Sequence, residues 1–110
     1  MRERISRINK LIKGKIAEIL QKEIFIKNVL ITVQGVDTSK DLKYTKIKVS
    51  IMPFGQSEKA LKVLKKNISH LQKRIGEEIR IKFIPKIRFI IDRTEEKANR
   101  VEEILRELTN

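Results

Sequence analysis

Hydrophobic residues near the start of the chain repeat at the spacing of a helix. Apolar side chains recur every three or four residues from Ile5 to Leu20, and this period predicts an amphipathic helix over about residues 4–23. Gly14 lies inside this segment, but one glycine costs a helix only about 1 kcal/mol relative to alanine. The opposite side carries basic residues, so we expect one buried stripe and one solvated face.

A second helical stripe follows the break at residues 53–55. We expect Ser57 to act as the N-cap of this helix and Gly76 to mark its end. Residues 94–108 form a third amphipathic segment, which is also expected to be a helix. The apolar residues expected to face inward are Val101, Ile104, Leu105 and Leu108 in this last helix, and Ala60, Leu61, Leu64, Ile68, Leu71 and Ile75 in the one before it.

Other segments alternate between apolar and polar residues, which is the period of a half-buried strand. They predict strands over about residues 29–36, 42–52 and 86–92. The polar sequence TSKD, residues 38–41, supplies turn residues between the first two strands. These two strands are therefore expected to pair as antiparallel neighbours.

The third alternation begins before the third predicted strand. It starts at Ile79 and would turn Ile81 and Phe83 toward the core. Pro85 has no N–H to donate to a ladder, however, and proline is usually confined to the start or the edge of a strand. We therefore expect the strand itself to start after Pro85.

The predicted order is helix, strand, strand, helix, strand, helix. It fits an α+β domain in which helices pack on one face of a three-stranded sheet and leave the other face open. The alternation puts Lys46 and Lys48 of one strand and Lys86 and Arg88 of another on that open face. Such a face is compatible with water alone or with a polyanion, because a sheet packed on one side is polar on the other by default.

Length and composition exclude several classes of protein. The 110 residues suit one domain, residues 1–110, with residues 94–108 as a C-terminal helical extension. The absence of cysteine excludes disulfides and thiolate metal sites, and the single histidine, His70, cannot form a histidine cluster. No apolar run is long enough for a membrane span, so we expect a soluble, cytoplasmic protein without a membrane partner.

Carboxylates leave one route to catalysis. Asp37, Asp41 and Asp92 could gather around a magnesium ion, but Asp37 and Asp41 lie in a turn, where capping by the side chain is the simpler role. The other carboxylates mostly sit beside lysines on predicted helices. We therefore expect no enzyme activity, no catalytic residue, no metal and no cofactor.

Charge gives the clearest indication of a partner. The chain has 26 Lys and Arg against 14 Asp and Glu, a net charge of +12. The excess lies in the predicted folded elements, because residues 57–92 carry ten basic and four acidic side chains whereas residues 93–110 carry four and five. This distribution favours a charged surface that binds nucleic acid over a basic tail. A membrane-surface role for the first helix has less support, since its apolar stripe lacks Trp.

Two blocks of the sequence resemble the ribosome-binding factor A family. The first is TVQGVDTSKDLKYTKIKVS, residues 32–50, where that family has a strand, a Gly-Val turn, a Ser-x-Asp-Leu element and a second strand. The second is IRIKFIPKIRFIID, residues 79–92, which is similar to the family's basic run, proline and last strand. The segments ILQKEI, residues 19–24, and RVEEIL, residues 100–105, match the family as well, so the resemblance covers most of the chain.

The resemblance implies a KH-like (type II) fold of order αββαβ plus a C-terminal helix. It also implies a non-catalytic, monomeric assembly factor that binds the small (30S) ribosomal subunit, assists late maturation and processing of its 16S rRNA, and serves in cold adaptation. Ordinary KH domains hold RNA with a Gly-x-x-Gly loop, which the family replaces by an Ala-x-Gly helix kink. The aligned residues here are Asn67, Ile68 and Ser69, so both small residues of the kink are changed.

Charge and resemblance together nominate RNA-binding residues around that kink, after it, on the second strand and on the first helix. Tyr44 could stack on a base, but packing on the sheet is the favoured role from sequence. A generic basic module that binds RNA or DNA through the same fold is the alternative function. The candidates are Arg4, Arg7, Lys10, Lys46, Lys48, Lys65, Lys66, Asn67, Ser69, His70, Lys73, Arg74, Arg80 and Lys82.

Overall fold

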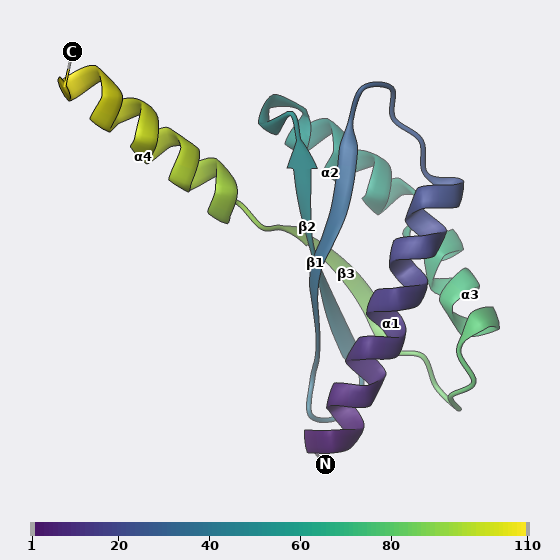
Figure 1. Ribbon diagram of the computed structural model, residues 1–110. Helices are drawn as coiled ribbons and strands as arrows, with labels where there is room; N and C mark the ends of the chain where they lie inside the picture. The colour runs from purple at the N-terminus through teal and green to yellow at the C-terminus, as the bar shows by residue number, and fades with distance from the viewer. Residues whose placement is uncertain (1, 110) are drawn as a thin grey trace.

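A computed structural model describes residues 2–109 of the chain, and Figure 1 shows a sheet with helices on one side and a last helix that projects away from it. The elements in chain order are α1 Arg2–Glu23, β1 Leu30–Thr38, β2 Tyr44–Met52, the short 3-10 helix η1 Phe54–Gln56, α2 Ser57–Lys66, α3 Ile68–Glu78, β3 Lys86–Ile91 and α4 Thr94–Thr109.

The three strands form one sheet in the order β1-β2-β3. β1 and β2 pair antiparallel, as the turn between them predicts, whereas β2 and β3 pair parallel, which requires the crossover through α2 and α3. A bulge at Gln34 shifts the register of β1, so that Val33 lies opposite Val49 and Gly35 opposite Lys48. The Gln34 amide donates a 2.9 Å hydrogen bond to Ser50 Oγ on β2.

The core lies between the sheet and α1, α2 and α3, which confirms the predicted α+β arrangement. Alternate residues of β2 point into it, and Ile47, Val49 and Ile51 are at most 1% exposed. The stripe of α1 meets them with Ile12 and Ile16, both fully buried. The helix period of α1 and the strand period of β2 therefore describe two sides of the same core.

The predicted second helix is two helices. α2 ends at Lys66 and α3 begins at Ile68, with only Asn67 between them. Ser57 is not the N-cap but the first residue of α2, and its hydroxyl donates to the Phe54 carbonyl at 2.7 Å. Gly76 does not end the helix either, because α3 continues to Glu78 and Gly76 lies where the Ile84 side chain packs against it.

The prediction that Phe83 faces the core is wrong, whereas Ile81 is partly buried and packs against the core as predicted. Residues 79–85 form a loop instead of a strand, and Phe83 is 77% exposed. The parallel ladder with β2 begins only at Lys86, which lies opposite Tyr44, so nothing holds the preceding residues in an extended pairing. Alternation without a neighbouring strand is not enough to make a strand.

The prediction that α4 turns its apolar stripe inward is also wrong. No residue of α4 is buried, and Val101, Ile104, Leu105 and Leu108 are between 50% and 77% exposed. α1, α2 and α3 already pack on the helix-bearing face of the sheet, and α4 projects away from it (Figure 1). Its first turn is nevertheless fixed, because Asp92 Oδ1 accepts hydrogen bonds from the backbone N–H and the hydroxyl of Thr94 and Arg93 pairs with Glu58 at 2.6 Å.

Candidate nucleic-acid interface

Four cations lie on the face of the sheet that the helices leave open. Lys46 and Lys48 of β2 and Lys86 and Arg88 of β3 are all exposed, and Lys46 lies opposite Arg88 in the parallel ladder. None of the ion pairs found within residues 2–109 includes any of the four. The predicted basic face is thus confirmed. Asp37 of β1 lies opposite Lys46 and reduces the net charge of this face.

The junction between α2 and α3 is a sharp break at Asn67. Its ψ of 9° departs from the helical value of about −42°. The Asn67 amide donates to the Val63 carbonyl at 2.7 Å, and its backbone N–H is shared between the Val63 and Leu64 carbonyls at 3.2 Å each. A side chain that donates a hydrogen bond to the carbonyl four residues earlier bends a helix. Asn67 therefore breaks the helix here without the small residues of the Ala-x-Gly kink.

Exposed cations surround this break. Lys65 and Lys66 occupy the last turn of α2, where positive charge also complements the helix dipole, and Lys73 lies on α3. Ser69 is exposed between them. In the part of the chain that the structure describes, no carboxylate pairs with these three lysines, so their charges remain available to a phosphate.

His70 and Arg74 both pair with a carboxylate of α1, and their role in RNA binding stays a prediction. His70 Nε2 lies 2.6 Å from Glu23 Oε1, and Arg74 Nε donates to Glu23 Oε2 at 2.8 Å. Arg74 Nη2 also reaches Glu78 Oε1 at 3.3 Å. The hydrogen bond from Arg74 lowers the pKa of the Glu23 carboxyl most, and the one with His70 lowers it further. The two side chains therefore fasten α3 to the end of α1.

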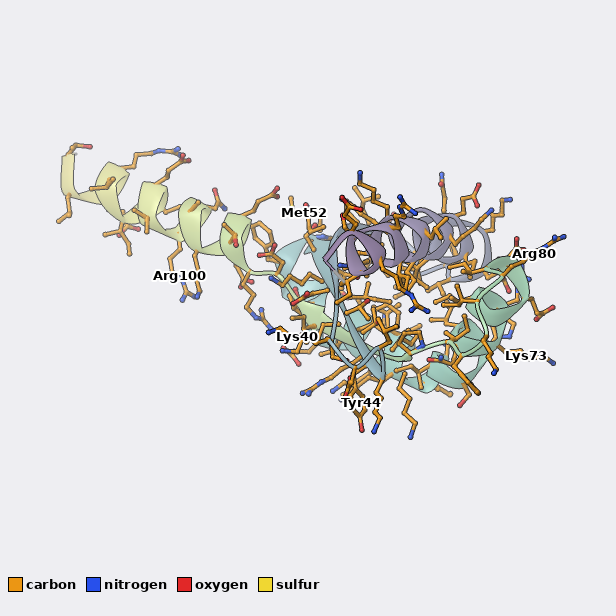
Figure 2. All side chains as sticks on the ribbon, turned by 90° about the horizontal axis from the view of Figure 1, so that it is seen from below. Lys40, Tyr44, Met52, Lys73, Arg80 and Arg100 are labelled. Carbon is orange, nitrogen blue, oxygen red and sulfur yellow. The ribbon has the colours of Figure 1, made fainter. Side chains whose placement is uncertain are left out.

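A third basic region surrounds a hollow between the start of α1, the β1–β2 turn and the loop before β3. The N-terminus and the β1–β2 turn lie at the lower end of the molecule in Figure 1. We call this hollow the basal hollow; its volume is about 830 Å³. It is lined by Arg4, Arg7 and Ile8 of α1, by residues 41–44 in the turn before β2 and at its first position, and by residues 81–86 in the loop before β3 and at its first position. Figure 2 views the molecule from this end.

The hollow also contains side chains that are not among the predicted RNA-binding residues. Tyr44 is 58% exposed on the open side of the sheet, so its predicted packing role is wrong, and Phe83 is the more exposed of the two rings. Lys43 and Lys86 also line the hollow. The sequence held one indication of Phe83. This ring belongs to the alternation that precedes Pro85, where the sequence did not predict a strand.

The predicted RNA-binding residues thus fall into separate groups. Arg4, Arg7 and Lys82 meet at the basal hollow, and Lys46 and Lys48 lie on the open sheet face. Most of the others lie around the break at Asn67. Lys10 is exposed on α1, and Figure 2 shows Arg80 with Lys73 at the end of the molecule away from Lys40, so Arg80 does not join the hollow.

The carboxylate of the β1–β2 turn serves local hydrogen bonds. Over residues 2–109, no three His, Asp or Glu side chains are grouped so that they could hold a metal ion. Asp41 Oδ1 instead accepts hydrogen bonds from Ser39 Oγ at 2.6 Å and from the Lys43 N–H at 3.1 Å, which lower its pKa. No helix within the same residues combines the length and apolarity that crossing a membrane requires.

Comparison with protein families decides the assignment of the chain. The model of the family described as ribosome-binding factor A matches residues 4–105. The chain belongs to this family. A ribosome-binding factor A from Acetivibrio thermocellus is 33% identical over 109 residues, which cover 96% of this chain and 88% of that protein. One from Vibrio campbellii is 29% identical over 110 residues, covering 97% and 82%.

Solved structures agree with the family. The crystal structure of ribosome-binding factor A from Thermus thermophilus has a TM-score of 0.67 and 23% identity, covering 79% of this chain and 94% of that one. A homology model of the Thermus thermophilus protein, fitted into a cryo-EM map of its complex with the 30S subunit, has a TM-score of 0.69 and 25% identity, covering 76% and 90%. The fold is accordingly KH-like, as the resemblance implies.

Proposed function

We propose that this protein is an assembly factor that binds the small (30S) ribosomal subunit and assists late maturation and processing of its 16S rRNA. It acts as a non-catalytic monomer in the cytoplasm and serves in cold adaptation. Membership in the ribosome-binding factor A family and the fitted complex of the similar Thermus thermophilus protein with the 30S subunit support this function.

The observation that carries the proposal is the break at Asn67 with three lysines around it that form no ion pair with any carboxylate of residues 2–109. Lys65, Lys66 and Lys73 present charge on two helices that meet at an angle, which gives the surface both charge and a distinctive shape. Lysines that neutralise phosphates release counterions, and shape complementarity selects a particular RNA junction. Such a protein assists folding by holding a junction in place and needs no reaction.

The open sheet face provides a second basic surface. Lys46, Lys48 and Arg88 can neutralise phosphates of the same RNA or of a neighbouring segment. If about six phosphates are engaged in total, the logarithm of the affinity should fall with the logarithm of salt concentration at a slope of roughly −4 to −5.

Cosedimentation in sucrose gradients tests the proposal. The purified protein is mixed at moderate salt with small subunits, large subunits, assembled ribosomes and duplex DNA. One variant replaces Lys65, Lys66 and Lys73 with Ala, and it retains Arg74 because that residue fastens α3 to α1. A matched control removes the same number of positive charges from α4, where Lys97, Arg100 and Arg106 are exposed.

Selective binding to small subunits that is lost in the first variant and kept in the control supports the proposal. Equal binding to all particles and to duplex DNA would instead identify a generic basic module that binds RNA or DNA. Equal weakening of both variants would also contradict it, because binding would then follow total charge and not the surface at Asn67.

A further inference from the structure

The basal hollow has walls that are fixed in place. Gln72 of α3 holds one wall, since its Nε2 donates to the Pro85 carbonyl at 2.7 Å and its Oε1 accepts from the Ile87 N–H at 2.9 Å. The Lys86 N–H donates to the Lys43 carbonyl at 2.9 Å and joins this wall to the start of β2. A volume of about 830 Å³ falls within the range of preformed ligand pockets.

The wall made by the β1–β2 turn is equally well defined. Leu42 has a φ of 62°, a left-handed conformation that a leucine adopts only where its surroundings impose it. The Leu42 N–H donates to the Ser39 carbonyl at 2.9 Å, and Asp41 Oδ1 accepts from Ser39 and Lys43 on either side. The hollow is therefore preorganised.

Two aromatic rings are exposed in the hollow although the core is close by. Tyr44 is 58% and Phe83 is 77% exposed, and Lys82 Nζ lies 5.6 Å from the centroid of the Phe83 ring. Exposed rings next to cations are the elements with which proteins bind single-stranded nucleic acid, because every base has a face that can stack on a ring.

Cations approach the hollow from all three segments that line it. Arg4 and Arg7 come from α1, Lys43 from the turn, and Lys82 and Lys86 from the loop before β3 and the first position of that strand. The lining contains one carboxylate, Asp41, which already accepts two hydrogen bonds within its own turn. A nucleotide within an RNA strand has an apolar base face and a phosphate on each side. Positive charge around an apolar floor is complementary to both.

We propose that the basal hollow binds an unpaired nucleotide of single-stranded RNA, with its base stacked on Phe83 or Tyr44. The hollow also continues onto the open sheet face, because Lys86 lies opposite Tyr44 and Arg88 opposite Lys46 in the next pair on that side. A strand that leaves the hollow therefore meets further cations. This inference rests on the proposed function, which brings RNA to the protein, but concerns a surface separate from Asn67.

Tyrosine fluorescence tests the inference without ribosomes. Tyr44 is the only tyrosine and the chain has no tryptophan, so the emission reports on the edge of the hollow and the sheet face that adjoins it. The probe is a single-stranded RNA of about 12 nucleotides, compared with the duplex that it forms with its complement. We expect saturable quenching by the single strand and none by the duplex.

Variants assign the quenching to stacking. Phe83→Ala should weaken binding at least about fivefold, and Phe83→Leu, which keeps apolar bulk without a ring, should do the same; circular dichroism checks that both variants fold. Tyr44→Phe keeps a ring and should retain the affinity of the native protein when the anisotropy of a labelled RNA is measured instead. The Lys65, Lys66, Lys73→Ala variant should still quench.

Equal quenching by the duplex would overturn the inference, and so would unchanged RNA affinity in both Phe83 variants. A third refuting outcome is a synthetic peptide of residues 94–109 that binds more tightly than the single-stranded RNA. The acidic, amphipathic helix α4 would then be the better occupant of the hollow. Small-subunit binding without quenching would refute the hollow and leave the proposed function standing. Quenching without small-subunit binding would refute the proposed function alone.

Discussion

Gln72 makes two hydrogen bonds on which the start of β3 depends. Residues of a parallel edge strand point their N–H groups alternately toward the neighbouring strand and away from it. The Lys86 N–H donates to β2, so the Ile87 N–H points outward, where Gln72 Oε1 accepts it at 2.9 Å. The same side chain donates to the carbonyl of the buried Pro85 at 2.7 Å. Gln72→Ala should remove both bonds.

The size of the effect follows from these two bonds. Each backbone group left without a partner costs about 1–3 kcal/mol, and the lower end applies because Gln72 is half-buried and water can enter. We therefore expect Gln72→Ala to lower the free energy of unfolding by about 2 kcal/mol. Gln72→Glu should lose about half as much, since a carboxylate still accepts from Ile87 but cannot donate to Pro85.

Urea denaturation measures the loss, and amide hydrogen exchange locates it. The Ile87 amide should lose protection in Gln72→Ala and keep more of it in Gln72→Glu. A change below about 0.5 kcal/mol in Gln72→Ala, the size typical of a neutral surface substitution, would refute the reasoning. So would equal protection of Ile87 in the native protein and Gln72→Ala.

Further predictions concern α4, Glu23 and the open sheet face. Deleting residues 94–110 should change the free energy of unfolding by less than about 1 kcal/mol, because no α4 residue is buried; a large fall in the urea midpoint would contradict this. The folded-state pKa of Glu23 is lowered from 4.5, so its contribution to stability is present above that value and is lost as the pH falls through the folded pKa. Glu23→Gln should therefore lose less stability than the native protein between about pH 5 and pH 3, and an identical pH profile would disprove the link to α3. Lys46→Ala with Lys48→Ala should make the salt slope of small-subunit affinity shallower by about 1.5 without changing the thermal midpoint; an unchanged slope would remove this face from the interface.

The periodic parts of the fold were predictable from the sequence. The stripe of α1 and the alternation of β2 each place one set of side chains in the core, and Ile12 and Ile47 are indeed fully buried. The same patterns misled where no partner surface existed. α4 has an apolar stripe but projects away from the sheet (Figure 1), and Phe83 alternates with polar residues but has no strand beside it.

The candidate site was predictable in its charges and less so in its geometry. Alternation places Lys46 and Lys48 on the open face, because the period of a strand is fixed by the backbone. The pairing of Glu23 with His70 joins residues 47 apart in sequence, and no local pattern reports such a contact. A side chain that the sequence pattern places on the surface can thus already have a partner in the fold.

Site-directed crosslinking tests most directly the central claim that the break at Asn67 faces 16S rRNA in the small subunit. The chain has no cysteine, so Ser69→Cys introduces a single attachment point beside the break, and Ala17→Cys provides an exposed control on α1. Each variant carries a photoactivatable crosslinker and is bound to small subunits. We predict crosslinks to 16S rRNA from position 69 and none from position 17. Crosslinks from position 17 alone, with both variants bound, would contradict the account.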